Sequence, residues 1–329
     1  MTDRSASIAA SWAPEIVVGF LIVCALAAGA LMSPNFLAAT FLLDAGTLYA
    51  ELGLVALTTT MVIVSGEIDL SVASMIALSA CIFAVCVDAQ VPFAVSVAAG
   101  LASGALMGLV NGLLVVGCGL PSLITTIGTA AFFRGLADVL LGDRSVTDFP
   151  AWWIGIDDVA ILGIPAPVLI LAAAAALAAV LLHATVFGRR VVLIGVNASA
   201  ARYAGIGIGG VKTWLFALNG LACAVAGLMM SSRLGVVRHD LASGAELQII
   251  LIAIVGGTSV AGGRGTIGGT FAAFWLLVLI QTGMILADIG IERQLIVLGA
   301  TLVVAIIASR LSIEPATKNG VPRLTLRRI

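Results

Sequence analysis

Long apolar runs separated by short polar segments make up most of this chain. A helix needs about 20 predominantly apolar residues to cross a bilayer, and no polar stretch is long enough to form a soluble domain. The pattern predicts an all-α, polytopic membrane protein. We expect about ten transmembrane helices, at residues 16–32, 45–64, 70–87, 91–116, 120–141, 164–183, 213–231, 245–261, 266–287 and 293–309.

Basic residues gather on one side of these predicted helices. With the N-terminus inside, the inner segments carry eleven lysines and arginines and the outer segments three. Lysine and arginine are enriched on the cytoplasmic side of membrane proteins, so we expect both termini in the cytoplasm. The predicted organisation is a cytoplasmic segment at 1–15, a transmembrane domain at 16–309 and a basic cytoplasmic tail at 310–329.

Composition supports a membrane location and excludes several other classes. Hydrophobic residues make up 61% of the chain and charged residues only 10%, whereas soluble domains carry about 25% charged residues. The net charge of −1 argues against a nucleic-acid partner. Five scattered cysteines without a CxxC pair, together with only two histidines, predict no metal site.

The stretch "GEIDLSVAS", residues 66–74, places two carboxylates inside an apolar region. A charge at the centre of a lipid-facing helix costs roughly 2.5–3.5 kcal/mol, so Glu67 and Asp69 need a reason to be there. One interpretation is a polar turn at the inner mouth, where Gly66 turns the chain and Asp69 or Ser71 caps the next helix. The other is a broken segment whose carboxylates bond to neighbouring helices or line a path.

Further polar residues also fall inside predicted helices. Arg134 should have a carboxylate partner if it is buried, and Asp138 or Glu51 could provide it; the alternative is a polar lining for a hydroxylated solute. Amide side chains both donate and accept hydrogen bonds, so together these residues suggest a path for a polar, uncharged solute. The candidates for such a path are Glu67, Asp69, Asn111, Arg134, Asn219 and Gln281.

Glycines recur every fourth residue in "GLASGALMGLVNG". On a helix, this spacing gives one smooth face on which another backbone can approach closely. We therefore predict a packing role for Gly100, Gly104, Gly108 and Gly112.

The longest inner loop, 184–212, carries four basic residues and no acidic ones. Its segment "NASAARYAGI", 197–206, has small residues followed by an arginine and a glycine. The loop could lie on anionic lipid, or it could form a short helix that inserts into a cytoplasmic partner.

Five motifs in order resemble a known family of permeases. They are "GEIDLSVAS" (66–74), "NGLLVV" (111–116), "LPSLITTIGTAAFFRGLADVLLGD" (120–143), "GRRVVLIGVNASAARYAGI" (188–206) and "GGTSVAGGRGTIGG" (256–269). The chain resembles the membrane permeases of bacterial ABC importers for monosaccharides from about Leu31 to Ser309. Glu67 stands where the family usually has glycine. This form, with "DFPAWW" (148–153) and "LLHATVFGR" (181–189), looks most like the rhamnose-type permeases; ribose, xylose or a furanosyl autoinducer are the alternatives.

The resemblance implies a permease of the bacterial inner membrane that works with several partners. These are a second permease copy or a paralogue, a cytoplasmic ABC ATPase and a periplasmic sugar-binding protein. The loop at 184–212 would be the coupling loop to the ATPase, since Ala200, Ala201 and Gly205 match the family's docking pattern. Ser199 replaces the usual glutamate there, and the basic residues of this loop are Arg189, Arg190, Arg202 and Lys212.

The chain lacks a GxxxxGK[ST] phosphate loop, so it cannot hydrolyse ATP by that means. We therefore expect a transport subunit that is not an enzyme, with no cofactor of its own and with ATP bound by the partner subunit. The alternative function is an ion-coupled secondary sugar transporter, which would need no ATPase. The sequence shows no obvious deep carboxylate relay for such coupling.

Overall fold

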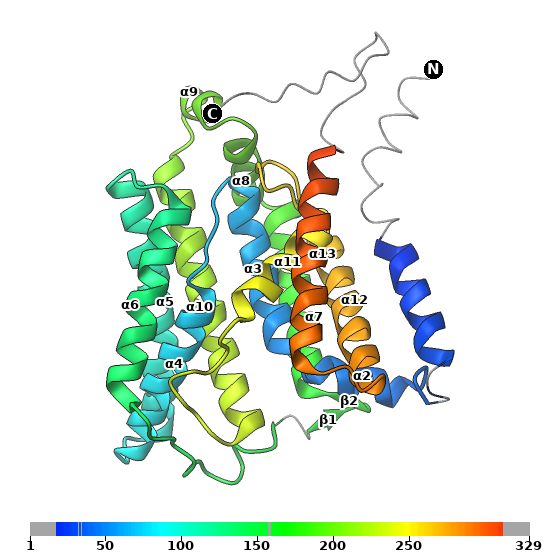
Figure 1. The fold of residues 1–329 in the computed structure, drawn as a ribbon. Coiled ribbons are helices and arrows are strands. Elements are labelled where there is room, and N and C mark those ends of the chain that lie inside the picture. The colour runs from blue at the N-terminus through cyan, green and yellow to red at the C-terminus, as the bar shows by residue number, and fades with distance from the viewer. Residues whose placement is uncertain (1–17, 32, 34, 157–158, 312–329) are drawn as a thin grey trace.

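The computed structural model describes residues 18–31, 33, 35–156 and 159–311. Nearly all of them form one bundle of helices (Figure 1). The expected segment 1–15 and the tail beyond 311 lie outside the described residues. The helices are Val18–Leu31, α2 (Ala39–Thr47), α3 (Ala50–Val64), α4 (Val72–Asp88), α5 (Phe93–Gly117), α6 (Ser122–Leu141), α7 (Ala166–Ala179) continued by the π-helical turn η2 (Val180–Ala184), α8 (Val186–Val196), α9 (Ala198–Tyr203), α10 (Ile208–Leu234), α11 (Ala245–Val255), α12 (Ile267–Leu286) and α13 (Ile291–Leu311).

Each of the ten expected ranges contains a helix, and the prediction of an all-α polytopic protein is confirmed. Within the described residues, five helices are long and apolar enough to cross a membrane, or six if the bent pair α2 and α3 counts as one span. The helix Val18–Leu31, α4 and α11 are apolar but shorter. The figure of ten spans and the cytoplasmic placement of both termini stay predictions.

Helix α3 lies at the centre of the bundle. It is buried along nearly its whole length and contacts α7, α10, α11 and α12. Because mostly apolar residues cover all its faces, it can be surrounded by other helices on every side. The most extensive helix contact joins α10, a neighbour of α3, to α5, whereas α6 exposes large apolar side chains to its surroundings.

Two helices begin only after an irregular stretch of chain. The extended segment, residues 65–71, connects the end of α3 to the start of α4, and the loop 235–244 precedes α11. Figure 1 shows the extended segment running back down from the α8 end of α3 before α4 begins. Irregular backbone is tolerated at membrane depth only where protein or a water-filled cavity surrounds it.

Backbone meets backbone where three segments come together near the end of α3. Val64 O accepts a hydrogen bond of 2.8 Å from Gly263 N. A Cβ placed on Gly262 would lie 2.9 Å from the Cα of Gly66 and 3.1 Å from the carbonyl oxygen of Gly195. We call Gly66, Gly195, Gly262 and Gly263 the glycine junction. It joins the extended segment to the end of α8 and to the loop before α12.

The opposite end of the molecule carries a small hairpin and a packed loop. Strands β1 (Ala160–Ile161) and β2 (Ile164–Pro165) pair antiparallel and lie at the end away from α9 (Figure 1). Trp153 Nε1 donates to Ser231 Oγ at 3.2 Å. Thus the loop that follows α6 is anchored to the end of α10.

Candidate functional site

The extended segment is held on one side by hydroxyl groups of α6. Ile68 N donates to Ser122 Oγ at 3.2 Å, and Leu70 N donates to Thr126 Oγ1 at 3.1 Å. Alternate residues of an extended chain are about 6.6 Å apart, and one helical turn rises about 5.4 Å. Two hydroxyls one turn apart can therefore serve alternate amides, so α6 takes the place of a partner strand.

On its other side, both carboxylates of the extended segment reach α10. Glu67 forms an ion pair with Lys212, and Asp69 Oδ2 accepts a hydrogen bond of 3.0 Å from Asn219 Nδ2. Residues two apart on an extended chain point to the same side, which explains why both carboxylates face one helix. Of the two interpretations, these contacts agree with bonding to neighbouring helices.

The capping interpretation does not describe this segment. Ser71 stands at the N-cap of α4, but it makes no side-chain cap bond within the described residues. Instead, Asp69 Oδ1 accepts from Ser71 N at 2.9 Å and from Ser71 Oγ at 2.6 Å. Ser71 Oγ in turn accepts from Asn111 Nδ2 of α5 at 2.8 Å.

Asn219 extends the network to α3. Its Oδ1 accepts hydrogen bonds from Thr58 Oγ1 at 2.8 Å and Thr59 Oγ1 at 3.2 Å. Asp69, Asn111 and Asn219 are all fully buried. Three of the predicted path residues, distant in sequence, therefore belong to one buried network, which spans α3, the extended segment, α5 and α10.

The chemistry available in this network is that of neutral hydrogen-bond groups around one carboxylate. Asn111 Oδ1 is buried, and no described residue donates a hydrogen bond to it. In the described part of the chain, no group of three or more His, Cys, Asp or Glu side chains could hold a metal ion. Gln281 of α12 is also buried and makes none of the bonds of this network.

Arg134 does not form the expected ion pair. Its Nη1 donates to the carbonyl oxygens of His239 at 2.8 Å and Leu241 at 3.0 Å, and neither Asp138 nor Glu51 lies in a salt bridge with it among the described residues. A guanidinium carries several donors in a fixed geometry, so it can satisfy carbonyls of an irregular loop directly. Arg134 thereby fastens the loop 235–244 to α6.

The two expected partners of Arg134 contact other basic groups. Glu51 Oε1 lies 2.8 Å from Arg233 Nε, which joins the first turn of α3 to the last turn of α10. Asp138 Oδ1 lies 3.5 Å from His239 Nδ1. The predicted carboxylate partner of Arg134 is therefore wrong. The sequence does not show which backbone carbonyl groups will gather around an arginine side chain.

The glycine strip of α5 lies against α10. A Cβ on Gly112 would be 2.8 Å from Thr213 Cα, and one on Gly108 would overlap the carbonyl oxygen of Phe216. At the other end of the strip, a Cβ on Gly100 would lie 3.1 Å from a side-chain carbon of Leu228. At Gly104, Gly108 and Gly112 the backbone of α10 can approach this closely only because no side chain is present, whereas Gly100 makes room for the Leu228 side chain.

The basic loop forms two helices at one end of the molecule (Figure 1). Helix α8 begins after Thr185, whose Oγ1 accepts from Gly188 N at 3.1 Å, and α9 begins after Asn197, whose Oδ1 accepts from Ala200 N at 3.0 Å. Tyr203 is 94% exposed. Ala201 is buried, and the exposed residues among those predicted for the coupling surface are Arg189, Arg190, Ala200, Arg202 and Gly205.

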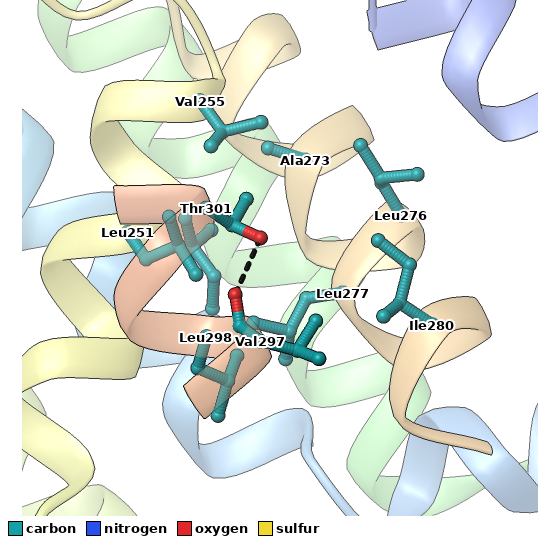
Figure 2. A pocket seen from close by; sticks show the side chains of 10 residues that line it. Leu251, Val255, Ala273, Leu276, Leu277, Ile280, Val297, Leu298 and Thr301 are labelled. Carbon is teal, nitrogen blue, oxygen red and sulfur yellow. Dashed lines mark hydrogen bonds between the residues drawn. The ribbon is translucent and has the colours of Figure 1, made fainter. Parts of the chain in front are cut away.

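An apolar pocket lies between α11, α12 and α13 (Figure 2). Its lining is aliphatic except for Thr301, whose hydroxyl donates to Val297 O at 2.7 Å. A polar solute would lose hydrogen bonds with water there and gain few in return. This pocket is therefore no candidate for binding a hydroxylated solute.

Several residues that hold the extended segment or the buried network are not among the path residues predicted from the sequence. They are Thr58, Thr59, Ser122, Thr126, Lys212 and Ser71, for which the sequence suggested only a capping role. The hydroxyls of α6 one turn apart were a usable signal, because they repeat on one helix face. Lys212 was counted only for the charge of its loop.

The chain is similar to known import permeases along most of its length. Residues 41–306 match the family model described as "Branched-chain amino acid transport system / permease component". The chain is 33% identical over 308 residues to the autoinducer 2 import system permease protein LsrD of Yersinia enterocolitica. This alignment covers 91% of this chain and 92% of that protein. It is 32% identical over 308 residues to the same-named protein of Photorhabdus temperata, with the same coverage.

A third relative, the same-named protein of Salmonella paratyphi B, is 31% identical over 310 residues, which cover 92% of this chain and 93% of that protein. No solved structure matches the chain. Coverage of nine-tenths of both chains leaves little room for a difference in architecture. The chain therefore belongs to this family of import-system permease components and is a multi-pass protein of the inner membrane.

Proposed function

We propose that this chain is the transmembrane subunit of an ABC importer that carries a small, polar, uncharged sugar-like solute. The observation that carries the proposal is the buried network around Asp69, in which a membrane-embedded chain keeps amide and hydroxyl groups of four segments together. Such groups bond to sugar hydroxyls as readily as to one another. The network is buried here, so a solute would meet it only when the helices separate.

A furanosyl autoinducer is the substrate that we put first. The relatives named above are autoinducer 2 import permeases, and nothing among them favours rhamnose, the sugar that the sequence motifs suggested. The motif "GEIDLS" is thus better treated as a marker of the permease family than of one sugar. Ribose, xylose and rhamnose are the competing sugars, and the family description adds branched-chain amino acids.

The proposed mechanism is alternating access driven by a separate ATPase. The exposed α9 with its flanking basic residues would dock on that ATPase, and a solute-binding protein would deliver solute at the opposite end of the bundle. A second permease copy or a paralogue would complete the pathway. In support of an external energy source, the chain has no phosphate loop.

The test is uptake by the whole importer in a deletion strain. Cells lacking this chain are given labelled furanosyl autoinducer, rhamnose, ribose, xylose and leucine, each with and without the restored gene. We expect restoration of uptake for the furanosyl compound alone. Restoration of rhamnose or leucine uptake instead would overturn the substrate, since the expected specificity rests on the relatives.

A second measurement separates the importer from a secondary transporter. Proteoliposomes with the chain alone and an ion gradient should take up no solute, whereas those with the ATPase, ATP and a binding protein should. Uptake by the chain alone would refute the ABC mechanism.

A further inference from the structure

Lys212 pairs with a residue 145 positions earlier in the chain. Its ammonium contacts the Glu67 carboxylate at the α3 end of the extended segment, and each side chain is 14% exposed. We propose that Lys212 is a positioning residue that holds the extended segment against α10 and keeps the α9 end of the solute path closed. This inference rests on the proposed transport function, but it holds whichever solute is carried.

The extended segment depends on such side-chain attachments because, among its described backbone bonds, only Ser65, Gly66 and Glu67 donate to carbonyl groups of α3. Its amides at Ile68 and Leu70 are held by α6, and its carboxylates are held by α10. The two attachments to α10 differ in burial. Asp69 and Asn219 are completely buried, whereas the pair at Lys212 retains access to water.

This difference decides which attachment opens first. Water can partly rehydrate an ion pair that keeps some exposure, so such a pair is broken at lower cost than a fully buried one. A fully buried carboxylate oxygen that loses its donor, as Asp69 Oδ2 would without Asn219, is left unpaired, which is unfavourable. The Glu67–Lys212 pair is thus the releasable attachment, and the Asp69–Asn219 bond is the one about which the extended segment turns.

The position of Lys212 links it to α9. Only residues 204–207 separate α9 from α10, and Gly205 among them has a φ of +77°. Lys212 lies in the second turn of α10, while Asn219 lies two turns further along the helix. A displacement of α9 therefore reaches Lys212 before it reaches Asn219.

The experiment measures how fast a cysteine in the extended segment reacts from the α9 side. Ile68 is partly exposed, and it is replaced as Ile68→Cys in a chain whose five native cysteines are changed to serine or alanine. The assembled importer, in inside-out vesicles without solute or ATP, is treated with a membrane-impermeant maleimide. We expect Lys212→Ala and Lys212→Gln to react at least threefold faster than the parent, and Lys212→Arg at the parent rate.

The charge-swapped double variant Glu67→Lys, Lys212→Glu tests the pair itself. A rate restored to that of the parent supports the proposal, since a merely structural loss at Lys212 would not be repaired by a second substitution. The matched control is Arg293→Ala, which removes an exposed basic residue from the first turn of α13. An increase of less than threefold, or a swap that stays as fast as the single variant, overturns the proposal.

The outcome is independent of the substrate assignment, because no solute enters the labelling assay. Membrane level and association with the ATPase are recorded for each variant. If Lys212→Ala fails to assemble, Lys212→Arg still tests the proposal, because it keeps the positive charge. A Lys212→Arg variant that reacts with the maleimide faster than the parent would count against the proposal. Failure of furanosyl uptake in the assay for the proposed function leaves this measurement intact.

Discussion

Substituting Gly108 by alanine should disrupt the contact between α5 and α10. The added Cβ would overlap the carbonyl oxygen of Phe216 and lie 3.0 Å from the Cα of Ala217. Both of these atoms belong to the backbone of α10, so no side chain can rotate away to make room. The two helices would have to separate along the glycine strip.

The expected cost follows from this geometry. Overpacking a close-packed interior typically costs about 1–3 kcal/mol. At Gly128 of α6, where a Cβ meets nothing within 4 Å, the same substitution should instead gain about 0.5–1 kcal/mol from lower backbone entropy in the unfolded chain. The two variants should therefore differ by roughly 1.5–4 kcal/mol in the free energy of unfolding.

The assay is reversible unfolding of the purified chain in detergent micelles by added sodium dodecyl sulfate, followed by circular dichroism. Gly108→Ala should shift the midpoint to lower denaturant, and Gly128→Ala should leave it unchanged or raise it. If Gly108→Ala proves as stable as Gly128→Ala, then α5 and α10 are not in backbone contact and the account of the glycine strip is wrong.

Three further changes test separate parts of the site. Asn219→Ala leaves Asp69 Oδ2 without its donor, and an unpaired buried acceptor costs about 1–3 kcal/mol; we expect lower stability and lost uptake, whereas Asn219→Gln should retain part of both. Arg134→Gln should free the loop 235–244, seen as faster cleavage by protease added from the outer side, and an unchanged cleavage rate would contradict the clamp. Gly205→Pro should uncouple ATP hydrolysis from uptake at normal membrane levels, and normal uptake would refute a coupling role.

The positions of the helices could be predicted from the sequence, but their contacts could not. Apolar runs and glycine spacing are local patterns, and each expected range contains a helix. The bond between Asp69 and Asn219 joins residues 150 positions apart. No local pattern specifies which helix faces the extended segment, so this pairing depends on the assembled bundle.

The errors have the same origin. An arginine inside an apolar helix predicted a carboxylate partner, yet Arg134 binds carbonyl oxygens of a loop. A serine before a helix suggested a cap as one of two interpretations, yet Ser71 donates to Asp69 and accepts from Asn111. In both cases tertiary contacts offered the side chain a partner that competed with the expected one. Within the site, the sequence could therefore identify polar residues but not their bonds.

The glycine junction has a consequence for the way movement spreads through the bundle. Gly66, Gly195 and Gly262 bring three backbone segments into direct contact. No side chain that could rotate or bend lies between these segments. A displacement of the end of α8 is therefore transmitted directly to the extended segment and to the loop before α12. The joint behaves as a rigid linkage, and its stiffness comes from the absence of side chains.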